Sequence, residues 1–358
     1  MYKREFAQLV HTLSYGDAIS SEVLAIDRAI KELGCGSAIY AINIHPQRKK
    51  MALDYRQLPA DFQGTVILHY SLGSPLNRVY FELSRARRLL IHHNITPPHW
   101  FDGINNRVKR DIEQGLREFP EICSTSDLII ADSEYNCREV EKLNFKGVLL
   151  EIPFDPERWC EPANKGLARI VKKSAKYNLL SIGRLAPNKK LEDVIKLFYF
   201  FHYHLERDSR LWLVGIDTDT EIYSFELKRL VNELHLGEAV TFTGSLADCE
   251  LRAMYENCDA YLCMSEHEGY CMPLMEAMYF GLPTIAFAAT AVPQTVANGG
   301  VLFSEKHLAE LAELTADIVR PGRLRDQIIV AGKARAAELN YPRFKESLAK
   351  LLEISPSD

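Results

Sequence analysis

Two glutamates, Glu268 and Glu276, are separated by seven residues in SEHEGYCMPLMEAMYFGLP, a segment typical of a turn from a strand into a helix. Pro273 is pre-organised for the first helical turn, where unpaired backbone N–H groups and the positive end of the helix dipole bind a diphosphate well. Gly269 lets the backbone approach such a ligand closely, and Glu276, one turn in, is placed to accept hydrogen bonds from ribose hydroxyls. Isolated glutamates more often only cap a helix, but here the surrounding pattern predicts a nucleotide site.

Two cations follow an earlier strand, because GRLAPNKK places Arg184 and Lys189 five residues apart. A diphosphate needs fixed positive charge both to bind and to leave, since negative charge develops on it as a glycosidic bond breaks. Cations at a helix start oppose the helix dipole, so a bound anion explains them better than solvation does. We therefore expect these two side chains to neutralise a diphosphate without a metal ion.

No cofactor or metal requirement is expected. Asp217, Thr218 and Asp219 spell a D-x-D pattern, but they follow a strand of a Rossmann-like half with no matched metal context, and we interpret them as loop or cap residues. The eight cysteines include no C-x-x-C pair, which predicts free, buried thiols without disulfides or a structural metal. No G-x-G-x-x-G fingerprint follows a first strand, which argues against a nicotinamide dehydrogenase.

Short apolar strand patterns alternate with segments of helical period along the whole chain. Strands are expected at 6–13, 37–44, 64–70, 89–94, 127–133 and 147–154, and again at 178–184, 210–215, 239–244, 260–265 and 284–289. This alternation predicts parallel sheets with helices on both faces. A chain of 358 residues exceeds the size of one ordinary core, so two such α/β domains are expected.

The pattern lapses between Asp155 and Tyr177, where prolines, a glycine and mixed charge suit an inter-domain connection. We predict one Rossmann-like, doubly wound domain over 1–160, a second over 161–340, and a C-terminal helix at 341–358 that packs back on the first, with the two domains facing across a cleft. Ligands of such sheets lie beyond the carboxyl ends of the strands. Gly16, after the first strand, is thus a candidate for close backbone approach to the diphosphate, with a simple turn glycine as the equal alternative.

The E-x7-E motif and its surroundings resemble glycosyltransferase family four, the large retaining family with the GT-B fold. The similarity covers nearly the whole chain, through the segments GDAIS, LLIHHNITPPHWF, ADSEYNCREVEKL, SIGRLAPNKKLEDVI, VTFTG, AYLCMSEHEGYCMPLMEAM and GLPTIAFAATAVPQTV. It implies that 1–160 is the acceptor side and that 161–340 binds the nucleotide sugar. It also implies roles for particular residues: His93 and Glu268 as catalytic residues beside the sugar, Gly16, Arg184, Lys189, Gly269, Tyr270, Cys271, Met272 and Glu276 as donor-binding, and Gly244 and Leu246 near the base.

The expected function is that of a retaining hexosyltransferase in polysaccharide or glycoconjugate biosynthesis. Its donor is a nucleoside-diphosphate sugar, UDP-glucose before GDP-mannose, and its acceptor a saccharide or lipid-linked oligosaccharide. Two alternatives stay open. One is another GT-B enzyme acting on nucleotide sugars, an epimerase or donor hydrolase. The other is a non-catalytic partner subunit, because Gln294 stands where many relatives have Glu and YGDA lacks a second glycine.

Charge is unevenly distributed, because residues 1–110 hold 15 Lys/Arg against 9 Asp/Glu in a chain of net charge −5. This surplus lacks the dense basic stripe of a nucleic-acid binder, so no nucleic-acid partner is expected. The N-terminal residues do not fit a signal peptide and no segment fits a membrane span, which predicts a cytoplasmic protein. A solvated surface explains the basic residues, and peripheral contact with the inner face of an anionic membrane is the competing hypothesis; the residues concerned are Arg48, Lys49, Lys50, Arg85, Arg87 and Arg88.

Overall fold

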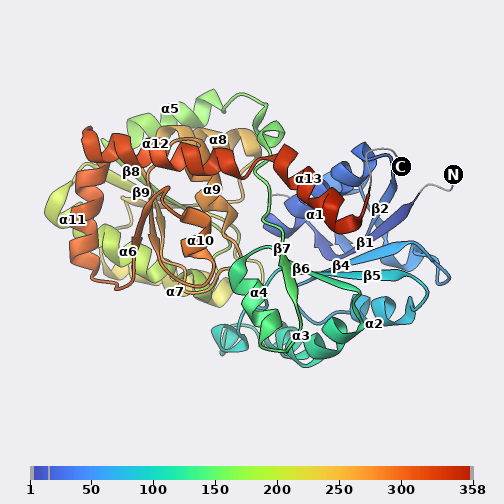
Figure 1. Ribbon diagram of the computed structural model, residues 1–358. Helices are drawn as coiled ribbons and strands as arrows, with labels where there is room; N and C mark the ends of the chain where they lie inside the picture. The colour runs from blue at the N-terminus through green and yellow to red at the C-terminus, as the bar shows by residue number, and fades with distance from the viewer. Residues whose placement is uncertain (1–3, 15–16, 355–358) are drawn as a thin grey trace. The chain divides into compact units, whose positions relative to one another are not determined.

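The computed structural model describes residues 4–14 and 17–354. The chain divides into two compact units, which we name the N-terminal and C-terminal domains (Figure 1). The N-terminal domain contains Met1–His99, Arg107–Pro153 and Leu339–Asp358, and the C-terminal domain contains Trp100–Asn106 and Phe154–Glu338. The division therefore falls after Pro153, earlier than the predicted 160, and a short segment from the middle of the N-terminal half belongs to the C-terminal domain.

The N-terminal domain is built on a seven-stranded parallel sheet in the order β3-β2-β1-β4-β5-β6-β7. The strands are β1 (Glu5–Leu13), β2 (Gly36–Ile44), β3 (Leu53–Asp54), β4 (Thr65–Tyr70), β5 (Arg87–His92), β6 (Leu128–Ala131) and β7 (Gly147–Leu149). The helices are α1 (Ala18–Glu32), α2 (Pro75–Glu82), α3 (Asn106–Thr125), α4 (Glu134–Glu141) and α13 (Tyr341–Leu352).

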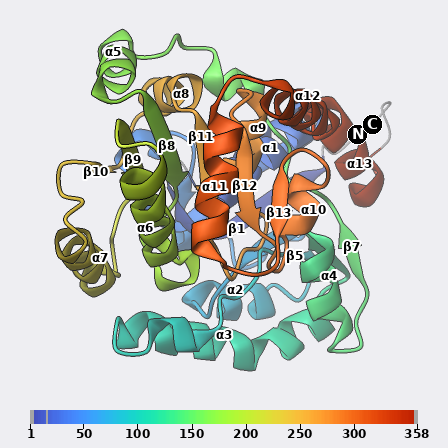
Figure 2. The same cartoon turned by 90° about the vertical axis from the view of Figure 1, so that its left-hand side faces the viewer.

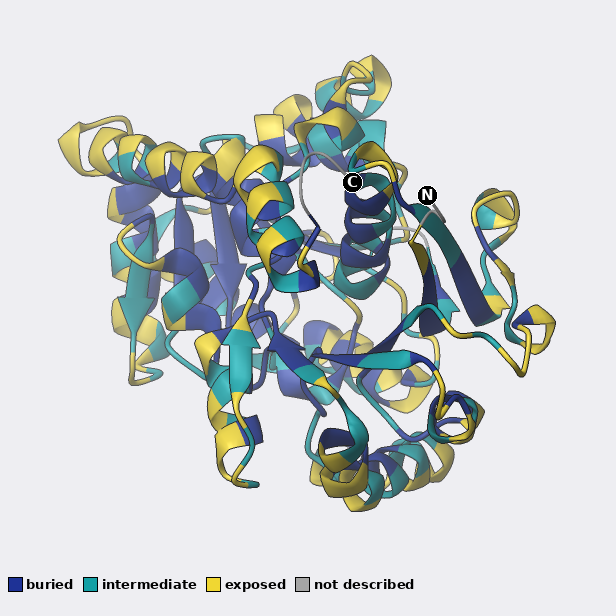
Figure 3. Cartoon of the chain, turned by 45° about the vertical axis from the view of Figure 1, so that its right-hand side comes forward, coloured by how far each residue is buried: buried dark blue, intermediate teal, exposed yellow. Residues whose placement is uncertain are grey.

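Burial explains why β1 and α1 form. Residues 6–10 of β1 are all buried, as expected for a parallel strand covered on both faces, and Figure 3 shows such strands in dark blue beneath helices with yellow outer faces. Helix α1 begins where the Asp17 carboxylate accepts a hydrogen bond from the Ser20 backbone N–H at 2.9 Å. Ile26 and Ile30, one turn apart on α1, share a core cluster with Leu348 of α13. The C-terminal helix thus packs within the N-terminal domain.

The C-terminal domain holds a six-stranded parallel sheet in the order β10-β9-β8-β11-β12-β13. Its strands are β8 (Tyr177–Ile182), β9 (Ser209–Val214), β10 (Val240–Gly244), β11 (Ala260–Cys263), β12 (Thr284–Phe287) and β13 (Val301–Phe303). Its helices are α5 (Lys165–Ser174), α6 (Leu191–Phe200), α7 (Glu221–Glu233), α8 (Asp248–Asn257), α9 (Met272–Tyr279), α10 (Val292–Val296), α11 (Leu308–Val319) and α12 (Arg323–Glu338). Figure 2 shows α6 and α11 together on one face of this sheet, where both contribute to the main core.

Both sheets confirm the predicted Rossmann-like, doubly wound architecture. In each sheet the first strand of the domain lies third from one edge, and the chain runs outward first to that edge and then to the other. The order therefore reverses between β1 and β4 in one domain and between β8 and β11 in the other. Ligands of open α/β sheets bind at such a switch point, beyond the carboxyl ends of the strands. The loops that follow β8 and β11 are accordingly where a site in the C-terminal domain should lie.

Candidate functional site

The loops after β8 and β11 are hydrogen-bonded to each other at the switch point of the C-terminal sheet. The first contains the 3-10 turn Pro187–Lys189, whose Asn188 side chain donates to the His267 carbonyl oxygen at 3.0 Å. The Glu266 backbone N–H donates back to the Asn188 carbonyl oxygen at 2.9 Å. Because the two loops are joined in both directions, the side chains that they carry hold a fixed relation to one another.

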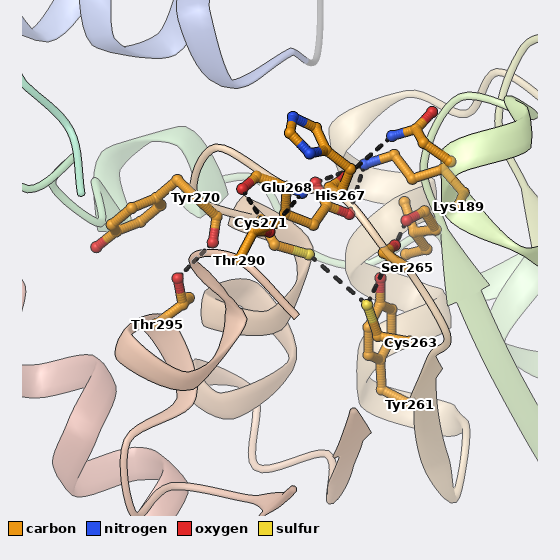
Figure 4. A network of polar contacts seen from close by, with 12 residues as sticks. Lys189, Tyr261, Cys263, Ser265, His267, Glu268, Tyr270, Cys271, Thr290 and Thr295 are labelled. Atoms are coloured by element: carbon orange, nitrogen blue, oxygen red, sulfur yellow. Dashed lines mark hydrogen bonds and ion pairs between the residues drawn. The ribbon is translucent and has the colours of Figure 1, made fainter. Parts of the chain in front are cut away.

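Lys189 and Glu268, which the sequence placed in two separate motifs, meet in an ion pair (Figure 4). The Lys189 Nζ lies 2.6 Å from Oε1 and 2.7 Å from Oε2 of Glu268. The Glu268 backbone is fixed as well, since its N–H donates to the Thr290 Oγ1 at 2.8 Å and its carbonyl oxygen accepts from the same hydroxyl at 2.9 Å. Glu268 is therefore held at both its main chain and its carboxylate.

The ion pair keeps Lys189 charged. Burial acts to lower the pKa of Lys189, but the neighbouring Glu268 carboxylate raises it, and the pKa ends above its ordinary value. An ammonium group has three N–H donors, of which two point to Glu268 in this arrangement. The third remains available for an anionic ligand, while the side chain is still 24% exposed. Lys189 can thus bind a phosphate without first releasing Glu268.

Arg184 lies on the same pocket as Lys189 and Glu268, so the structure brings together three of the predicted site residues. The pocket has a volume of about 10 Å³ and its wall includes the ends of β8 and β11. A cavity of that size holds about one water molecule, so it fits a single group of a ligand. Arg184 is exposed as a residue, and its guanidinium lies 5.7 Å from the centre of the Phe101 ring. Its charge therefore lies on the wall of the pocket that also holds the Glu268 carboxylate.

Glycines let the ends of β8, β9 and β10 converge on this edge of the sheet. The Gly183 N–H donates to the Val214 carbonyl oxygen at 2.9 Å, and the Gly215 N–H donates to that of Gly244 at 3.0 Å. Gly215 has a φ of 153°, and a Cβ there would lie 1.9 Å from the Gly183 oxygen, so only glycine fits. Gly244, predicted near the base, is thereby linked to the pocket wall, and Leu246 is half-buried in the loop that follows.

Helix α9 begins at Met272, as the position of Pro273 predicts. Cys271 precedes it in the left-handed conformation with a φ of 74°, and among the described residues no side chain caps the helix. The side chains of Tyr270, Cys271 and Met272 are all buried, so this turn offers a ligand mainly its backbone, together with that of Gly269. The Tyr270 carbonyl oxygen accepts a hydrogen bond from the Thr295 hydroxyl, which fixes the turn (Figure 4).

Glu276 lies in a different set of contacts from Glu268. Its Oε1 accepts from the Arg158 guanidinium at 2.7 Å, and its Oε2 accepts from the Tyr255 hydroxyl at 2.6 Å. Arg158 also binds Asp248 at 2.7 Å. Glu276 is only 4% exposed and does not line the pocket that holds Lys189. Because each carboxylate oxygen can accept two hydrogen bonds, this arrangement orients Glu276 and leaves it acceptor capacity for a ligand hydroxyl.

Sequence reasoning missed Arg158 and Tyr255 as partners of Glu276. Arg158 lies in a segment that its composition marks as an inter-domain connection, yet the adjacent Trp159 is only 4% exposed and anchors that segment in the C-terminal domain. The guanidinium lies 4.6 Å from the centre of the Trp159 ring. No local pattern around Arg158 signals this contact, because it depends on the tertiary fold.

His93, predicted to be catalytic, follows β5 directly and is sealed inside the N-terminal domain. The Gln8 side-chain amide donates to the Val23 carbonyl oxygen, so its Oε1 must accept from the His69 Nε2 at 2.9 Å. His69 then has its lone pair on Nδ1, which accepts from the His93 Nε2 at 2.9 Å. Burial, followed by the charge on His93, holds the pKa of His69 well below its ordinary value, so His69 is neutral.

The other His93 nitrogen faces two buried carboxylates. Nδ1 lies 3.3 Å from an oxygen of Glu22 and 3.3 Å from one of Asp132. Burial acts to lower the pKa of His93, and the two carboxylates, Glu22 foremost, raise it above its ordinary value. Neither Glu22 oxygen accepts a hydrogen bond from any residue that the structure describes, and burial raises the pKa of Glu22 to about 8. Because its three side chains are buried, the cluster orients the loop after β5 and does not itself contact a ligand.

The remaining predicted residues have plain outcomes. Gly16 lies outside the described residues. The loop prediction for Asp217 and Asp219 is confirmed, since the Asp217 carbonyl oxygen accepts from the Thr220 N–H and Asp219 has a φ of 68°.

All eight cysteines are free thiols, but the expectation that all are buried is wrong: Cys160 is exposed, and Cys137 and Cys249 are half-buried. Among the described residues no helix is long and apolar enough to cross a membrane.

Comparison with known proteins matches residues 162–335 to the family model "Glycosyl transferases group 1". Residues 162–335 thus form a group 1 glycosyl transferase domain. Among the relatives of the chain are the serotype-specific mannosyltransferase WbdA of Escherichia coli, 26% identical over 155 residues, and the human alpha-1,3/1,6-mannosyltransferase ALG2, 27% identical over 190 residues. These matches cover 40% and 50% of the chain but only 18% and 45% of the relatives' own lengths.

The chain also resembles solved structures over nearly its whole length. The structure of Anabaena Alr3699/HepE in complex with UDP and glucose has a TM-score of 0.77, covering 98% of this chain and 99% of that one at 15% sequence identity. At this identity the likeness bears on the fold alone. The fold is GT-B, as predicted.

Proposed function

We propose that this chain is a retaining, metal-independent glycosyltransferase that moves a hexose from a nucleoside-diphosphate sugar to a saccharide or lipid-linked acceptor. The observation that carries the proposal is the site at the switch point of the C-terminal sheet. There the loops after β8 and β11 hold Lys189 against Glu268, with Arg184 on the same pocket. Two cations around one buried carboxylate suit a ligand that carries a diphosphate at one end and sugar hydroxyls at the other.

In this mechanism Arg184 and Lys189 bind the diphosphate, and Glu268 orients the sugar next to it. The bond between the anomeric carbon and the diphosphate oxygen breaks, and its electron pair stays on the diphosphate, where the two cations stabilise the new charge. The acceptor oxygen bonds to the same face of the anomeric carbon, which retains the configuration. The proton of the acceptor hydroxyl passes to the leaving phosphate oxygen, so no protein carboxylate needs to act as nucleophile.

The ribose contact is assigned to Glu276, which Arg158 and Tyr255 hold in one orientation. Preorganisation of this kind lowers the entropy lost when a ligand binds. Residues Gly269–Met272 supply backbone to the diphosphate at the start of α9, and Gly244 and Leu246 border the base. His93 supports the loop after β5, on the acceptor side, through its buried cluster.

Two donors are candidates. The sequence places UDP-glucose before GDP-mannose, whereas the likeness of the chain to two mannosyltransferases supports GDP-mannose as the first donor to test. Incubating the protein with each donor and with lipid-linked and saccharide acceptors, with and without EDTA, tests the reaction class. Transfer that survives EDTA supports the proposal. Release of free sugar without transfer, epimerised donor, or dependence on a divalent metal would each contradict it.

Peripheral membrane contact is proposed for the basic surface of the N-terminal domain. Lys49 and Lys50 are exposed beside Met51 and Leu53, two large apolar side chains that are 48% and 44% exposed. Arg87 is engaged elsewhere, since it contacts the end of α13. Each lysine near an anionic surface contributes about 1 kcal/mol, so replacing both by glutamine should weaken binding to phosphatidylserine vesicles about 30-fold at low salt. Equal binding of the two proteins would contradict this contact.

A further inference from the structure

Two buried thiols lie beside the Lys189–Glu268 ion pair. Cys263 is the last residue of β11 and Cys271 is the residue before α9, and the loop between them brings their sulfurs to 3.9 Å (Figure 4). Both side chains are buried, and a Glu268 oxygen lies within 4.8 Å of both sulfurs. The three groups come from one loop whose ends are fixed by a strand and a helix, so their relation is set by the fold.

The separation of the two sulfurs matches that of a tetrahedral metal site. Two sulfurs bound at about 2.3 Å to one tetrahedral zinc ion lie about 3.8 Å apart, close to the observed distance. Two thiols in simple contact lie equally far apart, so the third group distinguishes the cluster: a carboxylate oxygen converges on both sulfurs. Cys271 also has a left-handed backbone, which is unfavourable for a residue with a side chain and is often found at functional sites.

We propose that Cys263, Cys271 and Glu268 form a binding site for a thiophilic divalent cation such as Zn²⁺. Each thiol loses its proton to solvent when its sulfur binds the ion, so two protons are released for each ion bound. The fourth position is taken by water. The Cys263 thiol donates to the Ser265 hydroxyl at 3.4 Å. Once the thiol has lost its proton to solvent, the hydroxyl can turn and donate to the thiolate.

Charge balance supports this assignment. Before binding, the Lys189 ammonium and the Glu268 carboxylate cancel each other, and protonated thiols add no charge. After binding, the two thiolates cancel the ion, and Lys189 still cancels Glu268 through its second oxygen. The buried cluster therefore gains no net charge, which avoids the large cost of burying an unpaired charge.

The ion occupies the pocket that the proposed function assigns to the sugar nucleotide, so it should inhibit transfer and is not required for it. This consequence rests on the proposed function, whereas the site itself does not. Zn²⁺ would engage Glu268, whose carboxylate the donor sugar needs, and would occupy space in the pocket beside Lys189. We expect micromolar Zn²⁺ to weaken donor binding by the wild-type protein at least 10-fold. In Cys263→Ser, the donor affinity with Zn²⁺ should equal the affinity of that variant without metal.

Titration of the reduced, full-length protein with Co²⁺ tests the site without any nucleotide. Co²⁺ bound by thiolates gives a charge-transfer band in the near-ultraviolet and, in a tetrahedral site, intense bands in the red. We expect one Co²⁺ per chain with both features, their loss on adding Zn²⁺, and their absence in Cys263→Ser and in Cys271→Ser. Cys258→Ser, a buried cysteine in the same domain, is the matched control and should keep both bands.

Absence of a thiolate band in the wild-type protein would overturn the proposal, and so would its persistence in Cys263→Ser. Glu268→Gln separates a two-sulfur site from the proposed one, because losing the carboxylate should weaken Co²⁺ binding at least 10-fold. Unchanged affinity in that variant would contradict the assignment. If the protein binds Co²⁺ in this way but no nucleoside diphosphate, the metal site stands and the proposed function fails.

Discussion

The two domains each hold a cluster of buried ionisable groups beyond the carboxyl ends of central strands, and the clusters differ in charge balance. In the C-terminal domain Lys189 matches Glu268 one to one, and the cluster lines a pocket. In the N-terminal domain His93 faces both Glu22 and Asp132, the acidic groups are in excess, and all three side chains are at most 3% exposed. The first arrangement suits binding of a further anion, whereas the second suits a proton held inside the fold.

The largest expected effect comes from breaking the C-terminal pair. Lys189→Ala should lower kcat by about 100- to 1,000-fold, because a cation aimed at developing charge is lost from a partly buried site. Lys190→Ala is the matched control, since Lys190 pairs with Glu192 and does not line the pocket, and it should change kcat less than 3-fold. Steady-state kinetics with the best donor measures both. Equal effects of the two substitutions would show that the cluster has no special role.

Arg158→Ala sharpens the contrast within the C-terminal domain, because it leaves two carboxylates, Glu276 and Asp248, without their shared cation. Removing one partner of a buried ion pair costs about 3–5 kcal/mol, and since Arg158 is 19% exposed we expect about 2–4 kcal/mol of lost stability. Urea unfolding measures this loss. Arg229→Ala, whose ion pairs are on the surface, should cost less than about 0.5 kcal/mol. If Arg158→Ala lost as little unfolding free energy as Arg229→Ala, a structural role for Arg158 would be contradicted.

The smallest effect, measured as a change per unit of pH, concerns the acidic excess of the N-terminal cluster. The pKa of Glu22 rises from an ordinary 4.5 to about 8, so between these values the folded protein keeps a proton that the unfolded chain has lost. The stability from this group is therefore present at low pH and falls as pH rises towards about 8, by up to about 1.4 kcal/mol per pH unit. The raised pKa of His93 acts in the same direction.

Glu22→Gln should flatten this dependence, because a neutral amide has no proton to retain. Urea unfolding at several pH values across that window measures the slope for both proteins. The exposed Glu141→Gln is the control and should keep the wild-type slope. A slope in Glu22→Gln as steep as that of the wild type would contradict the account of this cluster.

Much of the fold was predictable because strand and helix periods are local properties of the sequence. Both parallel sheets and the start of α9 at Met272 follow from apolar runs and from Pro273. The domain limits were less accessible, because the segment Trp100–Asn106 joins the C-terminal domain through tertiary contacts that no local pattern encodes.

The site was predictable only in part. Spacing placed Arg184, Lys189 and Glu268 after two strands, and the strand order brought them together. Long-range contacts such as Arg158 with Glu276, 118 positions away in the chain, leave no trace in local composition. The same limit applies to His93, whose buried partners come from α1, β4 and the loop after β6.

The loops after β8 and β11 are proposed to bind a nucleoside diphosphate through Lys189. Isothermal titration calorimetry of the metal-free protein with UDP and GDP measures this binding. We expect binding of at least one of them, at least 10-fold weaker in Lys189→Ala and unchanged in Lys190→Ala. No affinity for either nucleotide, or equal affinity in wild type and Lys189→Ala, would contradict it.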